Sequence, residues 1–335
     1  MEQSRKLPMP ARYGINAVVL ALLLLGGYFL VESGVLPRAH SNNIIQVGFF
    51  IILAVSLNLV TGYLGQLPLG HAGFMAVGAY AGAIFWRGGF LPDGASIIVG
   101  LLLAGLVAAV FGIIIGIPAL RLRGDYLAII TLGFGEMIRV LITNLPSITG
   151  GAPGISSPRY SSFLVVYLCV IFTCVAIHTL MKSRHGRAIL SIRENEIAAE
   201  SCGINTTYYK VMAFAVSAFF AGVAGALFAG NTGFLVPDSF DFMMSINILM
   251  IVVLGGMGSM AGSVIAAAVL TSLPVLMQFL AQWRMVIYAL LLIIVMIFKP
   301  TGLLGNYDFS LSRIIEKAMA RFGAAKTPKG GADCD

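Results

Sequence analysis

Residues 182–210, KSRHGRAILSIRENEIAAESCGINTTYYK, form the longest polar and charge-bearing stretch between two hydrophobic segments of this chain. Five of these residues are Lys or Arg and three are Glu. Ile189, Ile192, Ile197 and Ala198 recur at spacings compatible with short amphipathic helices, and Gly203 then marks a helix stop. Unstructured loops of this length are uncommon in compact proteins. The stretch is therefore either a docking surface for a soluble partner or a solvated loop that only orients the chain.

Outside this stretch the composition is that of a membrane protein. Of the 335 residues, 59% are hydrophobic and only 10% are charged, whereas soluble domains carry about 25% charged residues. The first apolar run, residues 14–31, is long enough to span a bilayer and no cleavage site follows it, so no signal peptide is expected. The four cysteines have neither disulfide nor metal-ligand spacing, and no metal site or cofactor is predicted.

The chain contains ten segments that approach the length of about 20 mostly apolar residues needed to span a membrane. They are residues 14–32, 43–64, 67–86, 96–118, 125–145, 161–181, 211–231, 243–257, 259–280 and 284–299. The third, fifth and eighth are glycine-rich or carry charge, and are candidates for short, broken or re-entrant segments. We therefore predict an all-α, polytopic membrane protein with about ten transmembrane segments.

The distribution of positive charge predicts the orientation, because Lys and Arg favour the cytoplasmic side of a membrane. With ten crossings and the N-terminus inside, 16 of the 21 Lys and Arg residues fall inside, four fall outside, and Arg139 lies within a span. Both termini and residues 182–210 are then cytoplasmic, and the net charge of +7 reflects topology and not nucleic-acid binding. Residues 1–305 form the transmembrane domain, and residues 306–335 are expected to form a basic amphipathic helix at the inner leaflet.

Part of the polar stretch carries a recognisable signature. Residues 193–205, RENEIAAESCGIN, resemble the coupling loop of ATP-binding-cassette (ABC) importer permeases, whose pattern is Glu-Ala-Ala-x-x-x-Gly. Here the acid stands one place earlier, at Glu196, as in permeases of the branched-chain amino acid family. The chain resembles that family over about residues 45–305. The resemblance implies an ATPase-coupling role for Arg193, Glu194, Glu196, Ala198, Ala199, Glu200 and Gly203.

A second informative block, residues 58–82, is rich in glycine and contains Pro68. Between two apolar spans this composition predicts a helix broken at membrane depth, which is tolerated where the backbone faces protein or a water-filled cavity. The freed backbone groups then bind polar substrate groups, or the glycines serve only close helix packing. Residues 65–72, GQLPLGHA, also resemble the branched-chain family. The candidate pathway residues in this block are Asn58, Gln66 and His71.

Two charged residues, Glu136 and Arg139, lie three apart within the predicted span 125–145 and share a helix face. Charge within a span is costly, and it marks either a functional site or an internally neutralised pair. Both residues are candidates for the translocation pathway, and an architectural ion pair is the alternative. The glycine-rich residues 255–262 predict a sharp turn between the eighth and ninth spans, because no acidic residue or βαβ context supports a dinucleotide site.

The chain lacks the chemistry of an ATPase or another enzyme. No P-loop motif is present, and no set of nucleophile, base and acid is evident, so we predict no enzyme. The membrane subunit of an ABC importer and an ion-coupled secondary transporter remain. The second class usually carries carboxylates in several spans, whereas only Glu136 lies clearly inside one here. The importer is therefore favoured.

The resemblance to branched-chain amino acid permeases also implies partners. These are two cytoplasmic ABC ATPase subunits, a second homologous permease subunit and an external substrate-binding protein. It implies a multi-pass protein of the bacterial inner membrane that carries branched-chain amino acids. Permeases for urea and short amides look similar, so these substrates are the alternative.

Overall fold

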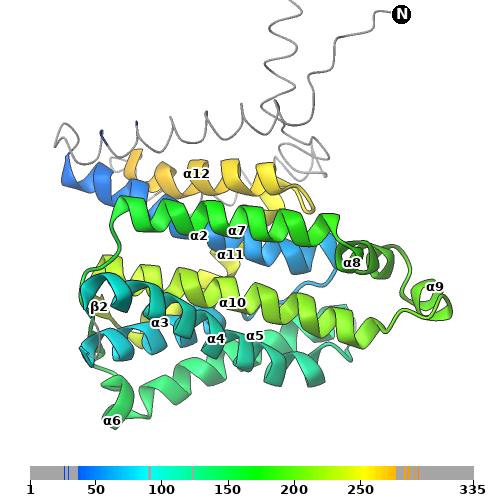
Figure 1. Cartoon of the computed structure of the whole chain (residues 1–335), viewed down its shortest axis with the longest axis horizontal. Helices are drawn as coiled ribbons and strands as arrows, with labels where there is room; N and C mark the ends of the chain where they lie inside the picture. The colour runs from blue at the N-terminus through cyan, green and yellow to red at the C-terminus, as the bar shows by residue number, and fades with distance from the viewer. Residues whose placement is uncertain are drawn as a thin grey trace, which may run out of the picture. The chain divides into compact units, whose positions relative to one another are not determined.

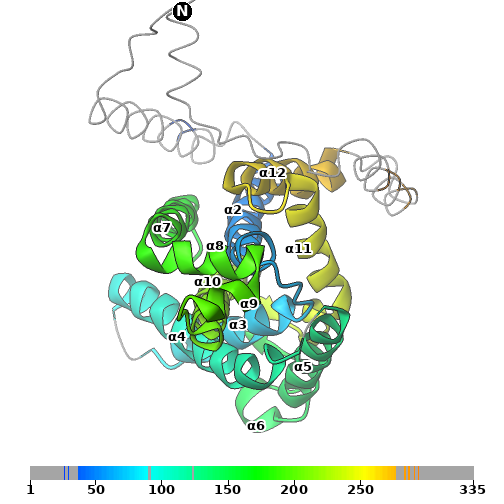
Figure 2. The same cartoon turned by 90° about the vertical axis from the view of Figure 1, so that its right-hand side faces the viewer.

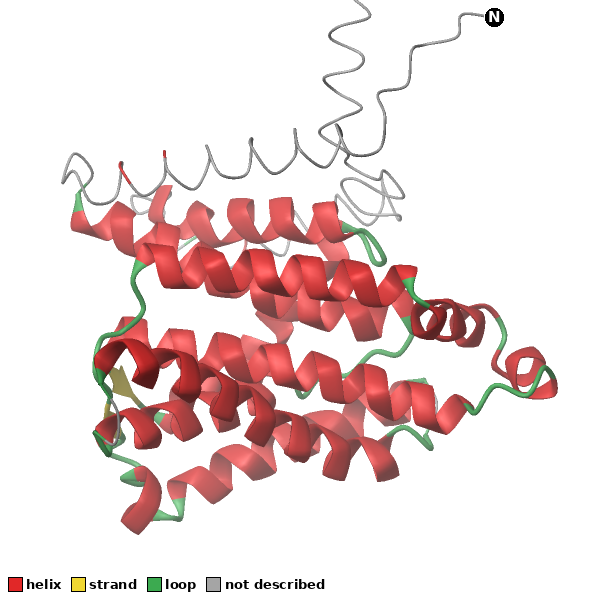
Figure 3. Ribbon diagram, in the orientation of Figure 1, coloured by secondary structure: helices red, strands yellow, loops and turns green. Residues whose placement is uncertain are grey.

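A computed structural model describes residues 37–89, 92–122 and 124–276, together with six single positions, residues 26, 29, 283, 286, 290 and 293. These ranges are almost entirely helical (Figures 1 and 3), which confirms the all-α class. The expected spans 14–32 and 284–299 and the tail 306–335 lie outside the described ranges. The number of ten spans and the positions of the termini therefore stay predictions.

The described helices follow one another with short connections. They are α2 (Arg38–Asn58), the π-helix η1 (Leu59–Tyr63), α3 (His71–Arg87), α4 (Asp93–Ala119), α5 (Asp125–Thr143), α6 (Pro146–Thr149), α7 (Phe163–Lys182), α8 (Arg184–Glu194), α9 (Glu196–Ser201), α10 (Thr206–Thr232), the 3-10 helix η2 (Pro237–Phe240), α11 (Phe242–Gly255) and α12 (Met260–Leu276). The two-residue strands β1 (Ile155–Ser156) and β2 (Phe234–Leu235) pair antiparallel, with Ile155 opposite Leu235.

Six helices of the described ranges are long and apolar enough to cross a membrane. They are α2 with η1, α4, α5, α7, α10, and η2 with α11. The third expected span forms a shorter helix, α3, of 17 residues. The described part of the ninth expected span is helical from Met260 to Leu276, as α12. The chain is thus a multi-pass membrane protein.

Helices α2 and α10 form the centre of the bundle, and α10 packs against α2, α3 and α4 (Figure 2). In their most apolar windows, 78% of the residues of α2 and 67% of those of α10 are buried, against 33% for α4, 22% for α5 and 28% for α7. The apolar surface of these last three helices is therefore available to lipid or to another membrane subunit.

Small residues bring α3 and α10 into close contact. A Cβ atom added at Gly78 would lie 2.2 Å from the Cα of Gly222, and one at Gly225 would lie 2.0 Å from the carbonyl oxygen of Met75. Backbones approach this closely only where side chains are absent or minimal. The packing role considered for Gly78 is thus confirmed.

The broken helix expected from the glycine-rich block is present. The α2–η1 helix ends at Tyr63, and a segment without helical structure leads to the start of α3 at His71. The segment lies against α5, because the amide of Leu69 donates to Thr131 Oγ1 at 3.0 Å. A Cβ at Gly70 would collide with the Thr131 carbonyl oxygen. The irregular backbone is therefore packed against protein, as an irregular segment at membrane depth must be.

The sharp turn predicted after residue 255 also forms. Helix α11 ends at Gly255, α12 begins at Met260, and Gly256 and Gly258 between them have positive φ angles of 104° and 89°. Glycine adopts such angles without the steric cost that other residues meet.

Candidate functional site

The polar stretch folds into two short helices, α8 and α9, as its spacing predicted. Each begins with a side-chain cap: Ser183 accepts from the amide of Gly186 at 3.4 Å, and Asn195 accepts from that of Ala198 at 3.1 Å. Such caps satisfy amides that have no partner within the helix. Gly203, with φ +82°, follows the end of α9, and Asn205 then caps α10. In Figure 1, α8 and α9 lie at the end of the bundle opposite β2.

Two acids of the coupling signature, the half-buried Glu196 and the exposed Glu200, tie α9 to α10. Glu196 Oε1 accepts from the ammonium of Lys210 at 2.7 Å, and Glu200 Oε1 accepts from the hydroxyl of Thr206 at 2.9 Å. Ala199 of α9 is buried as well. In α8, Ile189 and Ile192 are also buried. This face of the segment therefore holds it against the membrane helices.

Other positions of the segment are exposed. They are Glu194, Ala198 and Gly203, together with Arg193, whose side chain also reaches the membrane region. Ile197 is 67% exposed, so it does not share the buried apolar face of Ile189 and Ile192 that the spacing had grouped it with. Sequence analysis did not assign a docking role to Ile197. In the sequence, Ile197 is an apolar residue within a run of acids and alanines, and this is the feature that could have indicated an exposed apolar side chain.

Arg193 also contacts two irregular segments of the membrane region. A Cβ atom added at Gly65 would lie 3.2 Å from Arg193 Cγ, and one at Gly258 would lie 3.3 Å from its Nη1. The arginine therefore bridges the end of α8, the break before α3 and the turn between α11 and α12.

Asn58 is buried within the bundle and forms hydrogen bonds with the turn between α11 and α12. Its Oδ1 accepts from the amide of Gly258 at 2.8 Å, and its Nδ2 donates to Ser259 O and Ser263 Oγ, both at 3.0 Å. Close packing at Gly62 completes the contact, since a Cβ there would meet both Asn58 Oδ1 and the Gly258 amide. The geometry gives Asn58 an architectural function at this junction.

The two other candidates of the glycine-rich block lie near the helix break. His71 is buried at the first residue of α3, and its Nε2 lies 3.0 Å from the hydroxyl of Ser56. Gln66 is half-buried, and its backbone N–H donates to the backbone carbonyl of Val60 at 3.0 Å. Neither lines the cavity described next.

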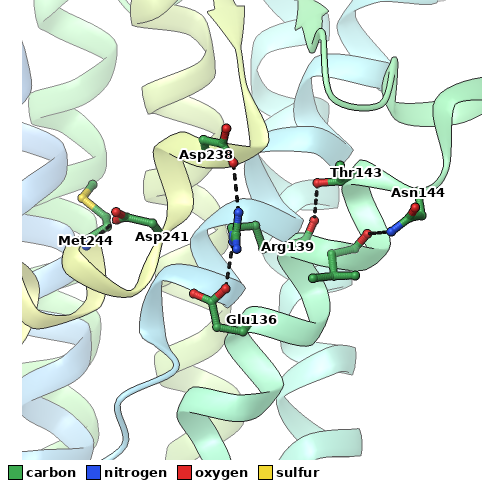
Figure 4. A network of polar contacts seen from close by, with 8 residues as sticks. Glu136, Arg139, Thr143, Asn144, Asp238, Asp241 and Met244 are labelled. Atoms are coloured by element: carbon green, nitrogen blue, oxygen red, sulfur yellow. Dashed lines mark hydrogen bonds and ion pairs between the residues drawn. The ribbon is translucent and has the colours of Figure 1, made fainter.

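Glu136 and Arg139 do pair, and a third residue joins them. Arg139 Nε donates to Glu136 Oε2 at 2.8 Å, and its Nη1 donates to Asp238 Oδ1 at 2.9 Å (Figure 4). Asp238 belongs to η2 and lies 99 positions along the chain. No local sequence pattern connects Asp238 to α5, so its place in this site could not be predicted from the sequence. Beside the pair is a cavity of about 170 Å³, lined by Arg139, Val140, Thr143, Asn144, Ala152, Pro237 and Asp238.

Comparisons with known proteins agree with these features. A family model described as branched-chain amino acid transport system / permease component matches residues 40–298. The chain is 38% identical over 330 residues to the high-affinity branched-chain amino acid transport system permease protein LivM of Salmonella typhimurium and to LivM of Escherichia coli K12, covering 86% of this chain and 74% of each relative. It is 24% identical over 282 residues to LivH of E. coli K12, covering 77% of this chain and 91% of LivH. No solved structure gave a significant match. The chain therefore belongs to the family of branched-chain amino acid transport permease components.

Proposed function

We propose that this chain is the membrane-spanning permease subunit of an ABC importer that carries branched-chain amino acids across the bacterial inner membrane, with ATP hydrolysed by separate subunits. The family match over residues 40–298 and the 38% identity to LivM proteins support this assignment. The observation that carries it is the capped α8–α9 pair, with some positions anchored to α10 and others exposed. A solvated connector needs no such anchor.

The proposed assembly contains two cytoplasmic ABC ATPase subunits, a second homologous permease subunit and an external substrate-binding protein. Similarity to both LivM and LivH supports a permease pair, because both names denote permease proteins of a high-affinity branched-chain amino acid transport system. The largely exposed apolar helices α4, α5 and α7 offer surface for the second permease.

Coupling would pass through three contacts of the α8–α9 segment. The exposed positions of the segment, including Ile197, dock on the ATPase. Movement of the docked segment reaches α10 through the Glu196–Lys210 pair, and it reaches the break before α3 and the α11–α12 turn through Arg193. The ATPase drives transport only if its contact free energy with these positions differs between inward-open and outward-open states.

A pull-down of the co-expressed complex tests the assignment. The tagged chain is co-expressed with candidate ABC ATPase and second-permease genes from the same genome, as wild type, Gly203→Asp or Gly89→Asp. Both glycines have positive φ, and a Cβ atom added at either would meet no other atom within 4 Å, so the backbone strain is matched. We expect ATPase recovery with wild type and Gly89→Asp and its loss with Gly203→Asp.

Uptake into proteoliposomes then identifies the substrate. ATP-dependent accumulation of labelled leucine supports the proposal, and accumulation of labelled urea in its place supports the short-amide alternative. Retention of the ATPases by Gly203→Asp, or uptake driven by an ion gradient without ATP, would overturn the coupling assignment.

A further inference from the structure

The Arg139 site lies at the opposite end of α10 from the coupling segment. Helix α10 has 27 residues, which corresponds to about 40 Å and exceeds the hydrocarbon thickness of about 30 Å. The coupling segment precedes its first residue, and Asp238 follows soon after its last. A site at Asp238 therefore faces the side of the membrane away from the ATPase, where an imported substrate enters.

The charged residues at this site are open to their surroundings. The side chains of Glu136 and Arg139 are 32% and 31% exposed, although both belong to the apolar helix α5, and that of Asp238 is 81% exposed. Charged groups within a span almost always face a protein interior or a water-filled cavity and not lipid. Here the cavity of about 170 Å³ adjoins Arg139 and Asp238 directly.

The charges of the site match a zwitterion. One guanidinium lies between two carboxylates, so the three groups together carry a net charge of −1. A zwitterion adds no net charge, and its ammonium can pair with a carboxylate of the site while its carboxylate pairs with the guanidinium. Arginine has five N–H donors in a planar fork suited to carboxylates, and its bonds to Glu136 and Asp238 involve only two of them. The carboxylate and the ammonium of an α-amino acid, which are separated by one carbon, can therefore each pair with an oppositely charged group of this site.

The size and lining of the cavity match a small aliphatic molecule. Pockets for drug-sized ligands measure roughly 300–1,000 Å³, so a cavity of about 170 Å³ suits something much smaller. Val140, Ala152 and Pro237 contribute apolar groups to the lining of the cavity. Thr143 and Asn144 donate to carbonyls of their own helix, at 2.9 and 2.8 Å, which keeps their donors away from the apolar part.

A second, much smaller cavity lies further along the same helix. It measures about 10 Å³ and is lined by Leu69, Ala72, Gly73, Leu132, Gly135, Glu136, Phe240, Asp241, Phe242 and Ser245. Such a volume holds at most about one water molecule. Glu136 therefore lies between the cavity at Arg139 and this much smaller cavity beside the helix break before α3.

We infer that Arg139 and Asp238 form an outer binding site for the zwitterionic head group of an α-amino acid. The substrate carboxylate binds the Arg139 guanidinium, the ammonium binds Asp238, and the aliphatic side chain occupies the cavity. The inference rests on the proposed function, because it assumes that the chain carries amino acids.

Direct binding to the purified complex tests this assignment. Tritiated leucine is bound to the full permease–ATPase complex without ATP and without binding protein, and is displaced by unlabelled leucine, by leucine amide, which lacks the carboxylate, or by 4-methylpentanoate, which lacks the ammonium. In wild type we expect each analogue to compete at least about tenfold more weakly than leucine, since charge-assisted hydrogen bonds have this magnitude.

The variants separate recognition from architecture. Asp238→Asn should remove the advantage of leucine over 4-methylpentanoate, and Arg139→Gln should remove its advantage over leucine amide. Arg87→Gln, which loses the same charge from an exposed residue at the end of α3, should change neither ratio. A purely structural ion pair would lower affinity for all three ligands equally. If Arg139→Gln does not assemble, Asp238→Asn decides the question, because its exposed side chain tolerates substitution.

Three outcomes would overturn the inference: unchanged ratios in Asp238→Asn, equal losses for all ligands, or no leucine binding to a wild-type complex that imports leucine. Weaker docking of the external binding protein to Asp238→Asn, with unchanged leucine binding, would instead make the site a protein contact. Failure of the proposed function is distinguishable, because the wild-type complex would then show no ATP-driven leucine uptake at all.

Discussion

The ammonium of Lys210 lies 2.7 Å from the Oε1 of Glu196 and joins the short helix α9 to the first turns of α10. The lysine side chain is only 4% exposed and that of the glutamate 22%. The acid of the coupling signature thus holds the segment in place, and a neighbouring residue, Ile197, presents the exposed apolar surface. The anchoring residue and the exposed apolar residue are thus adjacent in the sequence.

Replacing Glu196 with Gln should destabilise the complex by about 2–3 kcal/mol. Removing one partner of a fully buried pair costs roughly 3–5 kcal/mol, and the partial exposure of Glu196 reduces this. Thermal unfolding of the purified complex measures the change. The double variant Glu196→Leu, Lys210→Met should recover most of the loss, because no buried charge is then left unpaired. A double variant no more stable than Glu196→Gln would contradict the role of this pair.

Replacing Ile197 with Asp should weaken ATPase binding by about tenfold or more without lowering the stability of the permease. The side chain is 67% exposed, so the chain itself loses little packing, whereas a docked partner would have to bury a charge. Titration of the purified permease pair with ATPase measures the affinity. Ile148→Asp is the matched control, since Ile148 is 57% exposed in α6. Equal affinity of the two variants would exclude Ile197 from the interface.

Replacing Gly78 with Ala should destabilise the bundle by about 2 kcal/mol or more. The added methyl group would lie 2.2 Å from the Gly222 backbone, and overpacking of this kind typically costs about 1–3 kcal/mol. Thermal unfolding in detergent compares this variant with Gly94→Ala. Gly94 lies in α4 with no atom within 4 Å of an added Cβ, so its substitution should be neutral or slightly stabilising. A stable Gly78→Ala protein would show that α3 and α10 separate easily.

Replacing Asn58 with Leu should loosen the turn between α11 and α12. The substitution removes the acceptor of the Gly258 amide and two donors to α12 and the residue before it, and one unsatisfied buried group costs about 1–3 kcal/mol. Hydrogen exchange of residues 256–259 should accelerate, as mass spectrometry can measure. Asn247→Leu, at an exposed position of α11, is the control. Unchanged exchange at residues 256–259 would show that the turn holds its shape without Asn58.

Sequence patterns predicted the elements of this fold better than their contacts. Helical spacing and the stop at Gly203 predicted short helices within residues 182–210, and the glycine-rich block predicted the break after η1. These are local properties, since the spacing of apolar residues and a glycine helix stop do not depend on distant parts of the chain. The spacing did not reveal that Ile197 is exposed, because which face of a six-residue helix is buried depends on its neighbours.

By itself the sequence determined the membrane class, the helical fold and the position of the coupling-like segment, because composition, length and local hydrogen bonding do not depend on distant residues. Only the tertiary structure brought Asp238 to Arg139, the Gly258 amide to Asn58, and Gly222 to Gly78. The first of these pairs is separated by 99 positions and the second by 200. Apolar helices expose similar surfaces on all sides, so their packing partners are selected by the close fit of small residues and by polar groups that must find partners within the bundle.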